Sequence, residues 1–480
     1  MSGKEFKLGL SFDDILLVPH YSNIKSRKDI SLRTQFSRSI TLNIPIVSAN
    51  MDTVTESRMA IAMARAGGIG VIHRFLSIEE QVREVKKVKR AEQMTIDDPF
   101  TTRKNVTLGE ALAYMQTQGV SSLLVTGESG ALEGILTSRD VRFKTDMDMK
   151  VSELMTPRAR LVVGKKGISQ ARALRLLDEH KIEKLPIVSP RNRLAGLITA
   201  ADFRKTREHI HAAKDTEGQL LVGAAVGVKD GVERAEQLVR AGCDALVIDI
   251  AHGHHARAVQ LLRALKKRFK KTDVVAGNVV TARAVSDLVR AGADAVKVGI
   301  GPGAACSTRV VAGSGVPQIT AIMECAAAAR KLRVPIVADG GIKNSGDVAK
   351  AIGAGASSVM IGNLFAGSLE SPGEYYIEDG GAHKMYRGLA SREAAYDQAK
   401  REARAPLEAS LLTGRAPEGV GFRVSYKGEV GRILENLVDG LQSGMSYSGA
   451  RAISEFWKKA EFVRITEAGM KESAPRTNQA

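Results

Sequence analysis

One cysteine of this chain lies where its thiol could do chemistry. Cys306 occurs in "GIGPGAACSTRV", residues 299–310, and is one of three cysteines among 480 residues. The glycines and proline before it predict a bend that leaves the thiol accessible, and backbone N–H groups with Arg309 would favour the thiolate. A lone cysteine can also be a small core residue. We predict core positions for Cys243 and Cys325, and a nucleophile at Cys306 that attacks an electron-poor ring carbon.

Two glycine-rich stretches near the end of the chain could bind a phosphate group. Asp339, Gly340 and Gly341 end one apolar run, and Gly362 and Asn363 end the next. Small residues allow a ligand to approach the backbone closely, and backbone N–H groups at such turns bind anions. The alternative is that these are glycine turns without a ligand.

The elements that would position these residues are short apolar, β-branched runs alternating with helical patterns. Continuous apolar strands are typical of parallel sheets buried on both faces. Eight such strands predict an α/β fold of the (β/α)8 TIM-barrel type, whose reactive groups gather after the strands, and an open doubly wound sheet is the alternative. "RAGCDALVIDI" and "RAGADAVKVGI" are a near-repeat fifty residues apart, which supports the barrel. The expected strands are residues 44–50, 68–73, 220–226, 245–250, 273–278, 295–300, 335–341 and 358–363.

A segment with its own internal repeat interrupts the barrel after the second strand. "VSSLLVTGESGALEGILTSRD" (120–140) is echoed by "IEKLPIVSPRNRLAGLITAAD" (182–202), and each ends in a T-x-x-D turn. Two related units pack naturally as a pseudo-symmetric pair. We predict three segments: residues 1–92 (barrel, first part), 93–210 (the inserted pair) and 211–480 (barrel, second part, with the active-site loop, flap and C-terminal segment).

The inserted pair resembles a tandem of cystathionine-β-synthase-type (CBS) domains, also called a Bateman domain. In that family the Asp of T-x-x-D often holds the ribose of an adenine or guanine nucleotide. The alternative is that each Asp only caps a helix. The candidate regulatory residues are Thr137, Asp140, Thr199 and Asp202.

The composition limits the partners. The net charge of +17 favours anionic ligands such as nucleotides, whereas 4% aromatic residues provide few surfaces for stacking nucleic-acid bases. No apolar run reaches the ~20 residues of a membrane helix, and no signal peptide is evident. Three cysteines fit a reducing compartment. We expect a cytoplasmic protein without a membrane partner, with an organellar address left open and nucleic-acid binding as a minor alternative.

Motifs along nearly the whole chain resemble the IMP dehydrogenase/GMP reductase family. The resemblance implies the barrel with an inserted CBS pair, and a homotetramer that can stack into an octamer. It also implies that Cys306 attacks C2 of a purine nucleotide and that hydride passes between C2 and a nicotinamide cofactor. The matching stretches are "LSFDDILLVP" (10–19), "SANMDTVTE" (48–56), "GIGPGAACSTR", "VPQITAI" (316–322), "IVADGGI", "AGSLESPGE" (366–374), "YRG" (386–388) and "APEGV…YKG" (416–428).

The same resemblance implies a role for individual residues. Thr308 and Glu418 would relay protons, and Asp339 would hold the ribose. The phosphate and the rest of the substrate would lie on Ser48, Gly341, Gly362, Asn363, Tyr386 and Gly388. The nicotinamide would lie at Asp249, Asn278 and Gly299, and a monovalent cation, K⁺, on the backbone carbonyls of Gly301, Gly303 and Cys306. Two positions depart from the family pattern: Ala304 replaces a frequent Ser, and Asn363 replaces a usual Ser or Gly.

The resemblance leaves two activities to separate. The dehydrogenase hydrolyses the covalent intermediate with an adjacent Arg–Tyr pair on a mobile flap, and residues 391–420 contain no Arg–Tyr step. Without that base, attack by water should be slow. "AGNVVT", "MECA" and "DIA" also look closer to GMP reductase, although a CBS pair is more usual in the dehydrogenase.

We therefore expect an NADPH-dependent GMP reductase that converts GMP to IMP and ammonia. Purine nucleotides such as ATP or GTP would regulate it at the CBS pair. The first alternative is an NAD-dependent IMP dehydrogenase that makes XMP. The second is a nucleotide-sensing scaffold without catalytic activity.

Overall fold

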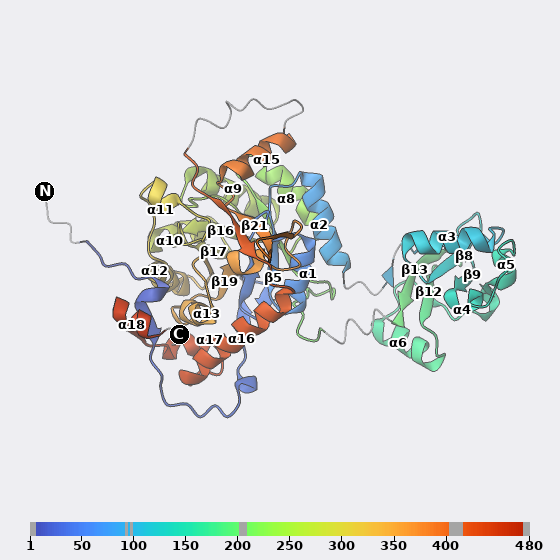
Figure 1. Ribbon diagram of the computed structural model, residues 1–480, viewed down its shortest axis with the longest axis horizontal. Helices are drawn as coiled ribbons and strands as arrows, with labels where there is room; N and C mark the ends of the chain where they lie inside the picture. The colour runs from blue at the N-terminus through green and yellow to red at the C-terminus, as the bar shows by residue number, and fades with distance from the viewer. Residues whose placement is uncertain (1–5, 92–94, 97–98, 201–208, 403–415, 474–480) are drawn as a thin grey trace. The chain divides into compact units, whose positions relative to one another are not determined.

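The computed structural model describes residues 6–91, 95–96, 99–200, 209–402 and 416–473. The chain divides into two compact units: residues 1–91 with 211–480, and residues 92–210 (Figure 1). The smaller unit is therefore an insertion in the sequence of the larger one.

Eight parallel strands close into a barrel in the larger unit, in the order β14-β15-β16-β17-β18-β19-β4-β5. Closure pairs β19 with β4, where Met360 lies opposite Val47, and β5 with β14, where Val71 lies opposite Gly223. The predicted barrel is confirmed, and the open doubly wound sheet is wrong. The strands are β4 (Ile46–Ser48), β5 (Ile69–Ile72), β14 (Val222–Val226), β15 (Ala245–Ile248), β16 (Asp273–Val279), β17 (Ala295–Val298), β18 (Ile336–Asp339) and β19 (Ser358–Ile361).

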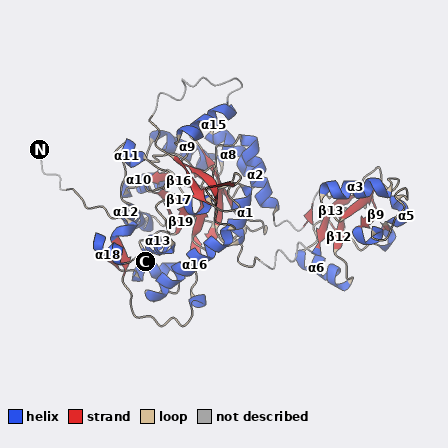
Figure 2. Ribbon diagram, in the orientation of Figure 1, coloured by secondary structure: helices blue, strands red, loops and turns tan. Residues whose placement is uncertain are grey.

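Helices surround these strands, as Figure 2 shows. The helix after β5 begins with a capping box: the Ser77 N–H donates to Glu80 Oε2 and the Glu80 N–H donates to Ser77 Oγ. The barrel helices are α1 (Ser57–Arg65), α2 (Ile78–Arg90), α8 (Gly231–Arg240), α9 (Ala256–Arg268), α10 (Ala282–Arg290), α12 (Gln318–Lys331) and α13 (Ser345–Gly353), with short α11 (Thr308–Val311) and α14 (Asn363–Ala366).

The barrel has apolar layers on both sides of its strands. Val47, Val71, Val247 and Met360 belong to the cluster that fills the interior. A larger cluster joins the opposite strand faces to the helices. Burial on both faces explains why the strands read as continuous apolar runs rather than as alternating ones.

Further elements lie outside the eight βα repeats. A three-stranded antiparallel sheet has the order β20-β21-β22, and helix α16 packs on α13. These elements are β20 (Tyr376–Glu378), β21 (Gly381–Arg387), α15 (Arg392–Glu402), β22 (Gly421–Ser425), α16 (Val430–Tyr447), α17 (Ile453–Lys459) and α18 (Glu467–Glu472). Near the N-terminus are η1 (Phe12–Asp14), β1 (Ile15–Leu17), which pairs with β23 (Phe462–Arg464), η2 (Arg27–Asp29), β2 (Thr34–Gln35) and β3 (Thr41–Leu42).

The inserted unit contains two four-stranded sheets, of order β10-β9-β8-β7 and β11-β12-β13-β6. The hairpin β8–β9 of the first repeat corresponds to β12–β13 of the second. The elements are β6 (Thr95–Ile96), β7 (Thr101–Thr102), α3 (Leu108–Gln118), β8 (Ser122–Thr126), β9 (Leu132–Thr137), α4 (Ser138–Val141), α5 (Val151–Leu154), β10 (Thr156–Pro157), η3 (Arg158–Arg160), β11 (Gly164–Lys165), α6 (Gln170–Glu179), β12 (Lys184–Val188) and β13 (Leu194–Thr199).

Among the described residues, no helix has the length and apolar character needed to cross a membrane.

Candidate active site

The loop after β17 presents Cys306 at the surface of the barrel. The Cys306 N–H donates to the carbonyl of Gly303 at 3.0 Å, which folds the loop back on itself. On its other side, Cys306 forms an antiparallel bridge with Gly419. Arg309 donates to the carbonyls of Ile300 and Val316 at 3.2 and 2.6 Å, so its guanidinium braces the loop through the backbone.

A line of hydrogen bonds joins the thiol to a carboxylate. Cys306 Sγ lies 3.2 Å from Thr308 Oγ1. The Thr308 hydroxyl donates to Glu418 Oε2 at 2.8 Å, and the Ser307 N–H holds the carbonyl of Glu418 at 3.0 Å. Proton transfer requires groups within about 2.6–3.2 Å of each other, and this line meets that requirement. The structure therefore brings together all three residues predicted to be catalytic.

A second cluster lies at the carboxyl end of β18. Asp339 Oδ2 accepts hydrogen bonds from the Lys297 ammonium and, at 2.9 Å, from the Asn278 side-chain amide. Lys297 lies on β17 with only 4% of its side chain exposed, and Asp339 is the carboxylate that pairs with it there. The Asn278 amide also donates to the carbonyl of Gly299 at 2.7 Å. With one oxygen of Asp339 held by protein donors, the other can accept ligand hydroxyls.

Gly299 permits close packing at this point. It has φ +144°, and a Cβ there would lie 2.1 Å from the carbonyl oxygen of Asp339. Only glycine can therefore connect β17 to the cysteine loop along this path.

A cavity of about 300 Å³ joins the two clusters. Eleven of the residues predicted for the site line it: Asp249, Asn278, Gly299, Gly301, Gly303, Cys306, Thr308, Asp339, Tyr386, Gly388 and Glu418. Residues from β16, β17, β18, β21, the segment after β15 and the 416–420 segment thus meet in one place.

The other predicted substrate residues lie around this cavity without lining it. Ser48 is buried at the end of β4 and accepts a hydrogen bond from the Thr55 hydroxyl at 2.9 Å. Gly341 follows β18, and a Cβ on Gly362 would lie 2.9 Å from the Tyr386 hydroxyl. Asn363 Oδ1 is buried without a hydrogen-bond partner among the described residues. A buried unpaired amide is a group that a polar ligand could satisfy.

Tyr386 contributes a hydroxyl that keeps its proton. Its side chain is buried, and burial together with the nearby Asp339 and Cys306 raises the pKa of the phenol above its ordinary range. It is therefore a hydrogen-bond donor throughout the physiological pH range.

The remaining cysteines are core residues, as predicted. Cys325 on α12 and Cys243 before β15 are both buried, and burial raises the pKa of each thiol to about 12. Of the three thiols, Cys306 is the one available for chemistry.

Comparison with known proteins identifies the relatives of this chain. The family model described as "IMP dehydrogenase / GMP reductase domain" matches residues 9–476. The chain belongs to the IMP dehydrogenase/GMP reductase family. The inosine-5'-monophosphate dehydrogenase of Nitrosopumilus maritimus (strain SCM1) is 48% identical over 98% of both chains. That of Helicobacter pylori (strain ATCC 700392 / 26695) is 49% identical over 97% of this chain and 95% of its own.

A solved structure resembles the chain over its full length. It is a cysteine-to-alanine variant of GMP reductase from Trypanosoma brucei in complex with guanosine 5'-monophosphate, with TM-score 0.91, 44% identity and 98% of both chains covered. GMP reductase from the same organism in complex with guanosine 5'-triphosphate gives TM-score 0.80 at 40% identity, covering 96% of this chain and 98% of its own. The chain is therefore a purine-nucleotide oxidoreductase of this family, and its relatives include both activities.

Two charged residues that pair with the predicted site residues were not predicted from the sequence. Lys297 pairs with Asp339, and Arg74 Nε donates to Asp249 Oδ2 at 2.8 Å. A signal for Lys297 was present, because it is the one charge within the apolar run "AVKVGI". Arg74 follows β5 and carried no comparable signal, since its contact with Asp249 depends on β14 lying between β5 and β15 in the closed barrel.

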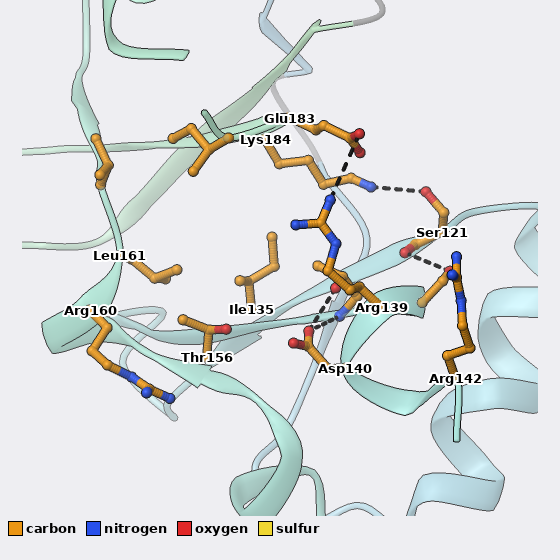
Figure 3. Close-up of a pocket in the computed structure, with 14 residues that line it drawn as sticks. Ser121, Ile135, Arg139, Asp140, Arg142, Thr156, Arg160, Leu161, Glu183 and Lys184 are labelled. Carbon is orange, nitrogen blue, oxygen red and sulfur yellow. Dashed lines mark hydrogen bonds and ion pairs between the residues drawn. The ribbon is translucent and has the colours of Figure 1, made fainter. Parts of the chain in front are cut away.

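The inserted unit has a cavity of its own, of about 360 Å³ (Figure 3). Thr137 and Asp140 line it, and so do Glu183 and Lys184 of the second repeat. Asp140 Oδ2 accepts hydrogen bonds from the Thr137 N–H and hydroxyl at 2.8 and 2.7 Å, which is the geometry of the helix-cap alternative. The second carboxylate oxygen of Asp140, Oδ1, is not part of that cap.

The charges of this cavity favour an anion. Arg139, Arg142, Arg160 and Lys184 outnumber Asp140 and Glu183 in its lining. As Figure 3 shows, Arg139 approaches Glu183, at 3.9 Å, and the Lys184 ammonium donates to Ser121 Oγ, at 2.8 Å. Of the other predicted regulatory residues, Thr199 ends β13 and does not line this cavity, and Asp202 lies outside the described residues.

Proposed function

We propose that this protein is a GMP reductase, which converts GMP to IMP and ammonia with NADPH as the reductant. The observation that carries the covalent chemistry is the hydrogen-bonded line from Cys306 through Thr308 to Glu418. It provides a nucleophile and a proton route beside one cavity.

The nucleotide would be held at two ends. Asp339, with one carboxylate oxygen already fixed by Lys297 and Asn278, would accept the ribose hydroxyls. The phosphate would lie on the backbone of Gly341 and Gly362 and on the side chains of Asn363 and Tyr386, with Ser48 and Gly388 completing the substrate pocket. Asn363 would donate its N–H₂ group to the phosphate. Binding at the phosphate and ribose positions C2 against the thiolate.

The chain's own residues then carry the protons. Cys306 loses its proton toward Thr308 and attacks C2, and the C2–N bond breaks as Glu418, through Thr308, protonates the leaving ammonia. When bound, the nicotinamide of the cofactor supplies hydride to C2. The C2–sulfur bond then breaks and returns the electron pair to Cys306.

The nicotinamide would lie against Asp249, Asn278 and Gly299. The Asn278 N–H₂ group is used by Gly299 and Asp339, so its Oδ1 is left for an N–H of the carboxamide. The residues therefore fit the group chemically.

The choice of GMP reduction over IMP oxidation is inferred from the absence of an Arg–Tyr step in the flap sequence. Residues 391–420 have no Arg–Tyr step to activate water, which disfavours hydrolysis of the thioether. The full-length likeness to a GMP reductase structure supports the same direction.

The second candidate is an NAD-dependent IMP dehydrogenase. The curated relatives of the chain favour it, because those of Nitrosopumilus maritimus and Helicobacter pylori carry that name at 48–49% identity. The residues that form and break the thioether are shared by both candidates, so the site alone is compatible with either one.

A paired assay separates the candidates. The purified protein is incubated with GMP and NADPH, and separately with IMP and NAD, at matched concentrations. We expect NADPH oxidation that depends on GMP and releases ammonia. NADH and XMP formation from IMP, without GMP-dependent NADPH loss, would establish the dehydrogenase instead. Inactivity in both assays with intact nucleotide binding would favour the non-catalytic scaffold.

We also propose the family's accessory ligands for this chain. A monovalent cation, K⁺, would lie on the carbonyls of Gly301, Gly303 and Cys306. The Gly303 carbonyl already accepts the Cys306 N–H, and a carbonyl oxygen has a second lone pair for the ion. Purine nucleotides such as ATP or GTP would bind the inserted unit at Asp140, and the chains would assemble as tetramers that can stack into octamers.

A further inference from the structure

A second cavity adjoins the active-site cavity and contains an uncompensated positive charge. Its volume is about 540 Å³, and it extends over the segments that follow β5, β14 and β15. It shares Arg74, Asp249, Ile250 and Ala251 with the first cavity. A ligand placed with one end at Asp249 can therefore continue into the second cavity.

Two of the three cations in its lining are neutralised by carboxylates. Arg74 Nε lies 2.8 Å from Asp249 Oδ2. Arg234 Nε lies 2.7 Å from Asp230 Oδ2, and the guanidinium is buried, donating also to the carbonyl of Leu76. Each of these two ion pairs therefore has no net charge with which to attract an anionic ligand.

Lys229 is the third cation, and it is exposed. Among the described residues it has no ion pair or hydrogen bond to a carboxylate. A lysine on a flexible stem acts as a compact point charge that binds phosphate. It lies three residues after the end of β14 and one residue before Asp230, whose Oδ2 accepts from Arg234.

We propose that Lys229 binds the 2′-phosphate of an NADP-type dinucleotide, and that it makes the enzyme selective for NADP(H) over NAD(H). This inference rests on the proposed nicotinamide position at Asp249 and Asn278. From there, the adenylate half of the cofactor would reach the second cavity, which shares Asp249 with the first. A phosphate monoester carries about −1.5 to −2 charges at pH 7, whereas each phosphate of the pyrophosphate bridge carries only one.

The acidic neighbour supports this choice of cofactor. Sites that select NAD typically offer a carboxylate to the 2′-hydroxyl of the ribose, whereas NADP sites offer a cation there. Asp230 is the carboxylate nearest to Lys229 in the chain, and its negative charge is offset by Arg234, whose Nε lies 2.7 Å from Asp230 Oδ2. The unpaired group that remains is the cation.

The test measures binding of cofactor fragments by calorimetry with the full-length protein and IMP present. The probes are 2′-phospho-ADP-ribose and ADP-ribose, which differ only in the 2′-phosphate. We expect the wild type to bind the phosphorylated probe at least tenfold more tightly. Lys229→Gln should abolish that difference and leave ADP-ribose binding unchanged. Lys229→Arg should retain the difference, and so should the control Lys331→Gln, a substitution of an exposed lysine on α12.

Several outcomes would overturn the proposal. An equal loss of both probes in Lys229→Gln would place Lys229 on the pyrophosphate bridge. If Lys229→Gln leaves the affinity for both probes unchanged, or if the wild type binds neither probe, Lys229 does not take part in cofactor recognition. None of these outcomes bears on whether GMP or IMP is the substrate, which the paired assay decides by itself.

Discussion

At the scale of single residues, the proposed covalent chemistry depends on the exposed thiol of Cys306. Cys306→Ala should lower turnover by more than about 1000-fold, because no other described group can form the covalent bond to C2. Binding of GMP measured by calorimetry should stay within a few-fold of wild type, since Asp339 and the phosphate residues are unchanged. Appreciable turnover in the variant would exclude covalent catalysis by this residue.

Glu418 can be tested separately from the nucleophile. Its carboxylate accepts the Thr308 hydroxyl at 2.8 Å and is the end of the proton route. Glu418→Gln should slow ammonia release by about 10²–10⁴-fold, the usual contribution of a positioned proton donor. Rapid-quench measurement should show a smaller effect on hydride transfer. Thr308→Ser keeps the hydroxyl and serves as the control that should remain active.

The two buried thiols should make the free energy of unfolding depend on pH in the alkaline range. Burial raises the pKa of Cys243 and Cys325 from 9.0 to about 12. The folded chain therefore holds these protons more tightly than the unfolded chain does. Their contribution to stability is full below pH 9 and falls as the pH rises toward 12, by about 1.4 kcal/mol per pH unit for each thiol.

Denaturant unfolding from pH 8 to 11 measures this effect. Cys325→Ala should reduce the pH dependence by close to one proton, although the small cavity lowers stability at every pH. An unchanged slope would show that Cys325 keeps its ordinary pKa in the folded chain.

At the scale of elements, Arg387 connects two segments around the cavity. At the end of β21, it bonds Asp52, after β4, and Asp397, on α15. Asp52 has 8% of its side chain exposed and Asp397 has 46%. Because solvent screens the more exposed pair, the two carboxylates should differ in energetic weight.

Neutralising each carboxylate in turn tests this difference. Asp52→Asn should lower the free energy of unfolding by about 2 kcal/mol, because a buried charge-assisted hydrogen bond is weakened while Asp397 still pairs with Arg387. Asp397→Asn should cost at most about 1 kcal/mol. Urea unfolding of the two variants provides the comparison, and equal losses would contradict it.

At the scale of the whole molecule, the inserted unit has cores of its own. The apolar clusters of the described residues belong either to the barrel or to the insertion. The barrel segments that flank the insertion are joined, because Lys89 Nζ lies 2.9 Å from Asp215 Oδ2. A short linker can therefore replace the inserted unit without disturbing the barrel.

Replacing residues 92–210 with a short Gly/Ser linker tests this independence. The shortened protein should keep its catalytic activity within a few-fold of wild type and lose any response to added ATP or GTP. Enzyme assays with and without these nucleotides provide the measurement. Loss of folding, seen by circular dichroism, would show that the barrel needs the insertion.

The sequence by itself determined the strands, the insertion and the accessible position of Cys306. Each depends on local patterns: apolar runs of strand length, a repeat with T-x-x-D turns, and a thiol in a glycine-rich loop. The motifs at Asp339, Tyr386 and Glu418 also identified the family, because they are specific even without knowledge of their positions in space.

Only the tertiary structure decided that the sheet closes and which charges meet. Closure depends on β19 pairing with β4, and no local pattern encodes that contact. The pair between Lys297 and Asp339 joins two neighbouring strands, and the bond from Thr308 to Glu418 spans 110 residues. Sequence patterns indicate which face of a helix or strand is buried. The distance between side chains that are remote in the sequence is set by the tilt and register of the strands in the closed barrel.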